Sequence, residues 1–237
     1  MTDDLWTKRS TTAAGQEAGR VRSPDSTYWR LKAYLLAQAP APRQLLRINA
    51  LAQELGTSGT PVREALIRLA TEKLVVYVPK KGFVAKTLSA AELHAMYFLN
   101  HTLLHAALEE ARRGGVIRNQ DQPGTASVAP STGMKETDIA HVTAMLFLRL
   151  ANEYGNEEIA AIICNLNDRL HHARVAESFA LDGLQEELQT LGRLIDEDER
   201  SALVEMVRKY HERRISALEA IHRELLLLPF TNARPSP

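Results

Sequence analysis

Hydrophobic positions recur with helical spacing near the start of the chain. Between residues 26 and 38 apolar side chains return every three or four positions, and Pro40 and Pro42 stop the pattern. A second, shorter pattern in INALAQELG predicts a helix that Asn49 caps and that Gly56 ends in a left-handed turn. The preceding residues, 1–25, are polar without an apolar period, which predicts a disordered arm.

The stretch TSGTPVREALIRL, residues 57–69, predicts a turn followed by a third helix. Residues 57–59 form the turn, Thr60 is expected to cap the helix, and Pro61 is expected at the first helical position, where its missing N–H costs nothing. The expected buried stripe consists of Val62, Ala65, Leu66 and Leu69. Two short helices about four residues apart, the second presenting its first turn outward, indicate a helix-turn-helix.

Two β-branched and aromatic runs follow, VVYVP and GFVAK, and they predict a hairpin. Its tip carries Lys80, Lys81 and Gly82. The hairpin could serve only as a lid on a small core, but a lid has no need of two lysines at its tip. A helix-turn-helix followed by such a hairpin is a winged helix.

Helical periods dominate the rest of the chain. Ser89 is expected to cap a helix that runs to about residue 113, and residues 114–135, rich in Gly, Pro, Ser and Thr, are expected to form a long loop. Further helices are expected at about 136–153, 156–178, 182–195 and 197–226. The predicted fold is mainly α: an arm over 1–25, a winged helix-turn-helix with a small β-hairpin over 26–88, and an all-α helical bundle over 89–237.

Charge is divided unevenly between these parts. Residues 1–88 hold 14 Lys and Arg against 7 Asp and Glu, a net charge of +7, whereas the remainder holds 15 against 22, a net charge of −7. A basic front and an acidic back indicate that the front meets a polyanion, although an uneven solvated surface is the alternative.

Several function classes find no support in the sequence. The one cysteine, Cys164, lies in the apolar run IAAIIC and is expected in the core, so neither a disulfide framework nor a thiolate metal cluster forms within one chain. The start of the chain lacks a secretion signal, and no apolar run approaches the roughly 18 to 20 residues of a membrane span. Motifs of nucleotide-binding loops, zinc proteases and serine hydrolases are missing too. We expect a cytoplasmic protein that is not an enzyme and has no cofactor.

The first turn of the third helix carries the chemistry that DNA recognition needs. The major groove admits one α-helix, and short polar or long cationic side chains at its start reach the base edges. Ser58, Thr60 and Arg63 fit this role, and a two-pronged bond from arginine to guanine contributes about 1 to 3 kcal/mol of discrimination. The alternative for Arg63 is a surface ion pair with a neighbouring glutamate, Glu54 or Glu64. Asn49 and the hairpin tip, Lys80, Lys81 and Gly82, complete the expected DNA-binding set.

These residues resemble a known family. TPVREALIRL, preceded by LAQELGTS and followed by EKLV and KKGFV, resembles the winged-helix domain of GntR-type bacterial transcription regulators over about residues 27–88. The rest of the chain is more weakly similar to the FCD ligand-sensing domain of the FadR-like branch, through SAAELHAMY, Gly155-Asn156, IICNLNDRL and IDEDERSALVEMV. The resemblance implies a homodimer on a palindromic DNA operator, acting as a repressor or activator, whose affinity changes when a small organic acid or its thioester enters the bundle.

The chain departs from this family at positions that matter for function. Gly59 stands where the family has an arginine in the turn, so one DNA contact is missing, and Lys73 stands where a glycine ends the recognition helix. The family's metal ligands fall on Thr143, Phe147, Leu188 and Tyr210, and its first-helix arginine falls on Asn100. The resemblance therefore predicts an effector site without metal, with these five positions as its lining, and favours a larger or less charged ligand, or none.

A rival function remains open at this point. The chain could be a dimeric ligand-binding or interaction protein whose DNA specificity has decayed, as the glycine in the turn suggests. His101 and His105, at i and i+4, have a spacing that can chelate a metal, but without an assigned carboxylate or thiol nearby they are expected at the surface or an interface. The adjacent His171 and His172 are expected to be solvated.

Overall fold

The computed structural model describes residues 24–113 and 135–229. The expected arm over 1–25 and loop over 114–135 lie almost entirely outside these residues. Within the two described ranges, no helix combines the length and the hydrophobicity that crossing a membrane requires.

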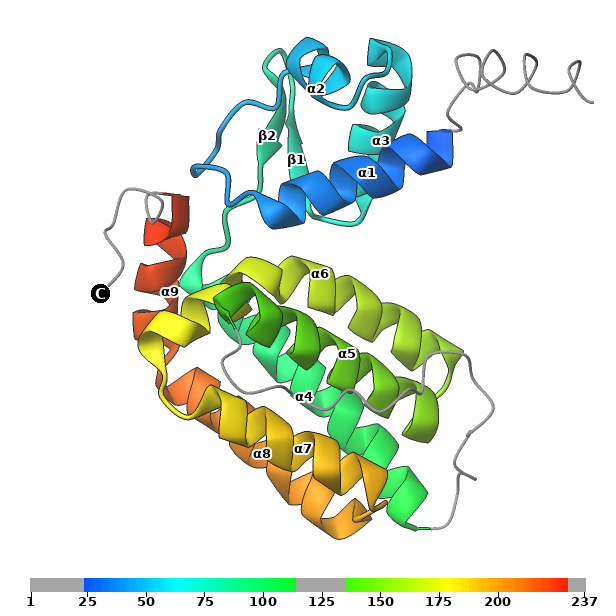
Figure 1. The fold of residues 1–237 in the computed structure, drawn as a ribbon, viewed down its shortest axis with the longest axis vertical. Coiled ribbons are helices and arrows are strands. Elements are labelled where there is room, and N and C mark those ends of the chain that lie inside the picture. The colour runs from blue at the N-terminus through cyan, green and yellow to red at the C-terminus, as the bar shows by residue number, and fades with distance from the viewer. Residues whose placement is uncertain (1–23, 114–134, 230–237) are drawn as a thin grey trace, which may run out of the picture.

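Three helices and a hairpin form the N-terminal part (Figure 1). They are α1 (Pro24–Ala37), α2 (Ile48–Glu54), α3 (Gly59–Thr71), β1 (Val75–Val78) and β2 (Gly82–Ala85). The strands pair antiparallel with Val76 opposite Val84, and an isolated bridge joins Leu45 to Val84. Buried side chains of all five elements form one small core that includes Tyr28, Leu31, Leu51, Val62, Leu66, Leu69, Val75 and Phe83. The predicted winged helix-turn-helix is confirmed.

Two predicted helix starts were wrong by about two residues. Arg47 is the N-cap of α2 and Ser58 is the N-cap of α3, so Asn49 and Thr60 both lie in the first turn of their helices. Ser58 has the extended backbone that an N-cap requires, and neither cap makes a side-chain hydrogen bond. Pro61 then takes the third helical position, where the N–H is still one of the four without an intrahelical partner.

Two left-handed residues close these helices. Gly56 follows α2 with φ 57°, as the sequence predicted, and Lys73 follows α3 with φ 62°. Lysine therefore adopts the conformation that the family resemblance assigns to glycine, at a cost of up to about 1 kcal/mol.

The C-terminal part is an all-helical bundle. It comprises α4 (Ala90–Arg112), α5 (Glu136–Tyr154), α6 (Glu157–Ala180), α7 (Leu184–Asp196), α8 (Arg200–Ser216) and α9 (Leu218–Leu227). Ser89 caps α4 through a reciprocal capping box with Glu92, which confirms that predicted start. The prediction of a single helix over 197–226 was wrong, because the chain leaves helical geometry at Ala217 (φ −97°, ψ 13°). No glycine or proline at this point of the sequence indicates the break.

A continuous apolar core fills the bundle, with Leu93, Leu104, Leu108, Leu146, Leu150, Leu166, Leu170, Leu203 and Val207 among its members. The short helix α9 turns back beside the segment that joins β2 to α4 (Figure 1). There, His222 Nε2 lies 3.0 Å from the carbonyl oxygen of Leu88. The predicted fold class, mainly α with one small hairpin, is confirmed.

The sequence YGN joins α5 to α6 in a tight turn. The Tyr154 hydroxyl donates to Asp198 Oδ1 at 2.7 Å, and the Asn156 side chain accepts from the backbone N–H of Ile159 at 2.9 Å, which caps α6. A Cβ on Gly155 would lie 2.5 Å from the carbonyl oxygen of Ala151, so only glycine fits between Tyr154 and Asn156.

Candidate nucleic-acid interface and effector site

An open groove of about 800 Å³ lies between the start of α2, α3 and the hairpin tip. Five of the seven residues expected to bind DNA line it: Asn49, Arg63, Lys80, Lys81 and Gly82. Four cationic side chains, Arg47, Arg63, Lys80 and Lys81, share this groove, and its lining contains no carboxylate. The groove therefore concentrates positive charge between the first turn of α3 and the hairpin.

The other two expected residues stand beside the groove. Ser58 and Thr60 are exposed at the start of α3 and do not line it. Arg47 and Gln53 of the α2 region do line it, and the sequence analysis missed both. The available signal for Arg47 was its place as a cation directly before the predicted helix-turn-helix.

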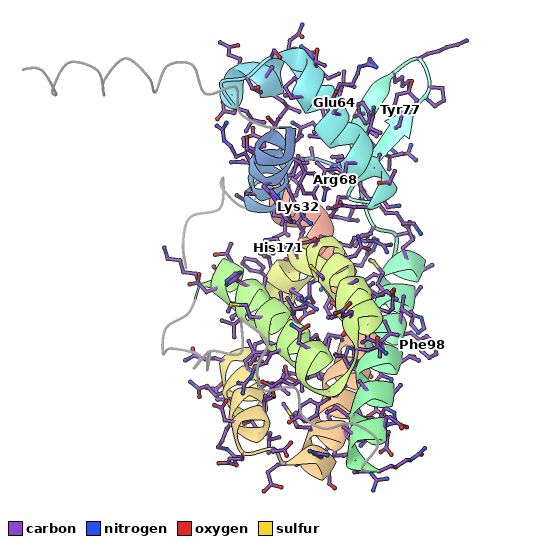
Figure 2. The ribbon with its side chains drawn as sticks, turned by 90° about the vertical axis from the view of Figure 1, so that its right-hand side faces the viewer. Lys32, Glu64, Arg68, Tyr77, Phe98 and His171 are labelled. Carbon is purple, nitrogen blue, oxygen red and sulfur yellow. The ribbon has the colours of Figure 1, made fainter. Side chains whose placement is uncertain are left out.

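Arg63 remains free for a ligand. Its side chain is exposed, and it forms no ion pair with Glu54, Glu64 or any other carboxylate of the described residues. The alternative assignment as a surface ion pair therefore finds no support. Near the hairpin tip, Tyr77 is 55% exposed and packs its ring 5.2 Å from that of Phe83 (Figure 2).

Gly59 packs against the start of α2. A Cβ at this position would lie 3.3 Å from Cγ2 of Ile48, a tight contact in which the branch methyl of Ile48 must move by a few tenths of an ångström. The backbone at Gly59 is not left-handed, since it is the first residue of a regular helix. A longer side chain fits there after a small shift of Ile48.

The five positions expected to line an effector site are all buried in the bundle. Asn100, Thr143, Phe147, Leu188 and Tyr210 are each at most 1% exposed. The centroid of the Phe147 ring lies 4.9 Å from that of Tyr210 and 5.6 Å from that of His211, on which it stacks. His211 Nε2 lies 2.9 Å from Asn100 Oδ1. The Thr143 hydroxyl is already used, because it donates to the carbonyl oxygen of Ile139.

These positions do not fit a metal ion. Phenyl, phenol and aliphatic side chains fill the places of the family's ligands, and nowhere in the described ranges do three His, Cys, Asp or Glu side chains come together as a metal site. Both ring nitrogens of His211 have partners, since Nδ1 lies 2.7 Å from the carbonyl oxygen of Val207. Burial lowers the pKa of His211 to about 3, so the ring is neutral at pH 7.

The neutral ring also determines how the Asn100 amide is oriented. Nδ1 must carry the hydrogen, because its partner is a carbonyl oxygen, and Nε2 is then an acceptor. Nε2 therefore needs a donor, which Nδ2 of Asn100 provides and Oδ1 does not. Because the two ends of an amide have the same shape, the side chain fits equally well with Nδ2 facing Nε2, and a hydrogen bond then forms. Asn100 and His211 therefore form a fixed pair inside the bundle.

Two expectations about other side chains were wrong. Cys164 is exposed on α6 rather than buried in the core, because the apolar run IAAIIC has Ile163 facing inward and its neighbours facing out. His171 and His172 are not solvated, since both lie where α6 meets α1. Burial lowers the pKa of His171 to about 4 and also lowers that of His172.

The sequence analysis missed the buried arginines. Arg214 is 1% exposed and pairs with two carboxylates, Glu177 at 3.0 Å and Glu187 at 2.6 Å. Arg149 pairs with Glu153 and Asp196, both at 2.6 Å. Both arginines continue the buried stripe of their helix, since Arg214 follows Val207 and Tyr210 at helical spacing, and this position was the available signal.

Polar contacts of α6 connect the bundle to the winged helix (Figure 2). Lys32 of α1 pairs with Asp168, and its amine lies 3.1 Å from the Tyr28 hydroxyl. The Asn165 side chain donates to the carbonyl oxygen of Glu72 at 3.0 Å, and His172 Nε2 lies 3.1 Å from the carbonyl oxygen of Leu36. These three contacts of α6 are spaced three and four residues apart, so they lie on one face of that helix.

Residues 25–84 match the family described as bacterial regulatory proteins, gntR family. The chain is 31% identical over 140 residues to the Nta operon transcriptional regulator of Aminobacter aminovorans, covering 54% of this chain and 63% of that protein. It is 36% identical over 94 residues to an uncharacterized HTH-type transcriptional regulator of Streptomyces ambofaciens, covering 40% and 39% of the two chains. The matched region thus spans less than two thirds of each relative.

Solved structures share the fold at low identity. The E. coli protein McbR/YncC has a TM-score of 0.56 and 17% identity over 83% of this chain and 96% of its own. A putative GntR transcriptional regulator of Rhodococcus sp. RHA1 has a TM-score of 0.59 and 12% identity over 83% and 97% of the two chains. The part of this chain that matches the gntR family of bacterial regulatory proteins, residues 25–84, is therefore its winged helix.

Proposed function

We propose that this protein is a sequence-specific DNA-binding transcription regulator, a repressor that acts as a homodimer on a palindromic operator and responds to a small organic effector. The groove between α2, α3 and the hairpin carries the DNA-binding part of this proposal. It gathers four cations with no carboxylate, in the segment that matches the gntR family. Arg63 is the fifth residue of α3, near the end of the helix that enters the major groove and reaches base edges.

Selection from random genomic fragments tests sequence-specific binding. We expect the purified protein to enrich one palindromic sequence and the Arg63→Ala variant to lose about 10-fold or more in affinity for it, since one good arginine–guanine pair contributes about 1 to 3 kcal/mol. Arg113, exposed at the far end of α4, offers a matched control, because Arg113→Ala removes the same charge away from the groove. Equal binding of all fragments by the wild type would rule the proposal out.

The surface of α4 supports the homodimer. Phe98 is 58% exposed and Leu99 is 41% exposed, so two large apolar side chains lie in water on an outer face of the bundle (Figure 2). A second copy of the chain is the occupant that a two-fold operator requires. Phe98→Glu should convert the dimer to a monomer in light scattering, whereas Met145→Glu, on a less exposed apolar position of α5, serves as the control.

The contacts of α6 support control by an effector. Lys32 and Asp168 join the winged helix to the bundle as a pair, and Asn167, next to Asp168, faces the bundle interior at 7% exposure. A ligand that moves α6 therefore acts directly on the position of α1. Lys32→Met should keep DNA binding and reduce the change in DNA affinity that an effector causes, as measured by fluorescence anisotropy with and without the effector.

Gly59 favours one other function, that of a dimeric ligand-binding protein with decayed DNA specificity. The missing arginine removes one DNA contact from the turn before α3. This alternative predicts that the wild type enriches no palindrome and that Arg63→Ala leaves DNA binding unchanged, so the selection experiment separates the two functions.

A further inference from the structure

Arg174 differs from the other buried arginines. It is 1% exposed, like Arg214, but it pairs with no carboxylate of the described residues. Its contacts are a hydrogen bond from Nη1 to the neutral Asn167 Oδ1 at 2.9 Å and the Phe147 ring, whose centroid lies 5.2 Å from its Cζ. Among the described residues, its Nε–H has no acceptor.

An unpaired buried charge is costly, because it loses its hydration without a compensating ion pair. Arg214 and Arg149 show how this chain offsets that cost, with two carboxylates for each arginine. The same solution at Arg174 requires an anion from outside the described residues. An arginine fork matches the two oxygens of a carboxylate.

A hollow large enough for such an anion lies directly beyond Asn167. Its volume is about 440 Å³, within the range of small-molecule sites. It is lined by Leu36, Ala37, Thr137, His141, Ala144, Asn167, Asp168 and His171, from α1, α5 and α6. Asp168 is its one carboxylate, and Lys32 neutralises it.

The Asn167 amide separates the hollow from the arginine. Its oxygen accepts from Arg174, and its Nδ2 donates to the carbonyl oxygen of Ala144 at 2.8 Å. The amide oxygen thus occupies the place of a ligand oxygen next to the guanidinium. When Asn167 swings aside, an anion in the hollow reaches Arg174.

We propose that the hollow between α1, α5 and α6 binds a small organic carboxylate, whose charged end pairs with Arg174 in place of Asn167. This inference rests on the effector part of the proposed function and deepens it, since the ligand class is a carboxylate and the anchor is on α6. The lining of the hollow includes none of Thr143, Phe147, Leu188 and Tyr210, and only the anchor Arg174 contacts one of them, the Phe147 ring. Because α1 contributes Leu36 and Ala37, a bound ligand contacts the winged helix itself.

Thermal unfolding of the full chain tests this site without DNA. We compare sodium acetate and sodium benzoate with sodium chloride at equal ionic strength, and include inorganic phosphate to distinguish a carboxylate site from a general oxyanion site. Saturation at one hundred times Kd should raise Tm by about 5 to 10 °C. No rise in any carboxylate, or an equal rise in phosphate, would overturn the proposal.

Two substitutions at Arg174 and one at Arg214, which already pairs with two carboxylates, test whether the rise in Tm depends on Arg174. Arg174→Met should abolish the carboxylate-dependent rise and leave the Tm in chloride unchanged or higher, whereas Arg214→Met should lower the Tm in chloride because it strands two carboxylates. Arg174→Lys keeps the charge and should weaken binding about 10-fold or more, because the fork is lost. A carboxylate-dependent rise that persists in both Arg174 variants contradicts the site.

The outcome for this site is separable from that for the regulator. Carboxylate binding at Arg174 that leaves DNA affinity unchanged would support the site and refute effector control. Loss of operator selection in Arg63→Ala, with no carboxylate binding in the wild type, would support the regulator and refute the site.

Discussion

Replacing Lys80 and Lys81 with alanine removes the two exposed cations at the tip of the hairpin. Neither side chain pairs with a carboxylate in the part of the chain that the structure describes, and both line the groove beside Arg63. If this groove receives DNA, the two lysines neutralise phosphates and release condensed counterions. The salt dependence of binding should then fall, while the fold is unaffected.

The expected size follows from counting the cations. Arg63 is assigned to guanine, so each groove offers three cations to phosphates and two copies make six phosphate contacts; log K should then fall with log[salt] at a slope of about −5.4, a loss of about 2 × 10³-fold between 50 and 200 mM. The double variant retains two contacts, so its slope should be about −1.8 and the loss over the same range about 12-fold. The wild type and the variant should thus converge in affinity at high salt.

Fluorescence anisotropy with a labelled duplex selected by the protein measures both slopes. The double variant Lys135→Ala/Lys209→Ala is the matched control, since it removes two exposed lysines of the bundle and the same net charge. A slope that stays at the wild-type value in Lys80→Ala/Lys81→Ala, or that falls equally in the control, would show that the hairpin does not contact DNA.

Three further predictions concern the turn, the bundle and pH. Gly59→Arg should restore a phosphate contact and steepen the salt slope by about 0.9 per copy, with Ile48 shifting slightly to admit it; an unchanged slope would mean that residue 59 faces away from DNA. Gly155→Ala should destabilise the fold by roughly 1 to 3 kcal/mol in urea unfolding, whereas Gly59→Ala should cost much less, because the first meets backbone and the second only a side chain. Burial lowers the pKa of His211 to about 3, so below pH 6.5 the unfolded state binds more protons than the folded state. The free energy of unfolding therefore decreases as the pH is lowered, and this group accounts for a decrease of about 2 kcal/mol at pH 5. His211→Gln should lose correspondingly less stability between pH 7 and pH 5, and an equal loss in both proteins would contradict the buried neutral ring.

Element order and type followed from the sequence because local signals agreed with the packing. The Ser89 capping box and the left-handed Gly56 are set by neighbours within four residues. The starts of α2 and α3 were misplaced because both helices begin without a side-chain cap, so the polar side chains of Asn49 and Thr60 do not mark where the helical backbone starts. The break at Ala217 depends on packing and leaves no local signal.

The candidate sites were predictable only where they depend on one segment. The hairpin lysines and Arg63 are visible in a single stretch of about 25 residues. Arg174, by contrast, stands out because it has no carboxylate partner among the described residues, and the sequence shows neither that absence nor the partners of Arg214, which come from α6 and α7. Likewise, the expectation that His171 and His172 are solvated was wrong because the sequence does not show that α1 packs over this part of α6.

The contacts of α6 with the winged helix have a consequence for exchanging DNA-binding modules. Asn165 and His172 bond to main-chain oxygens, those of Glu72 and Leu36, which any residue at these positions supplies. Only the contact with Lys32 requires a particular side chain from the winged helix. A foreign winged helix with the same backbone path and a lysine at this position should therefore dock on this bundle, so the DNA-binding module can be exchanged by grafting while the bundle stays intact.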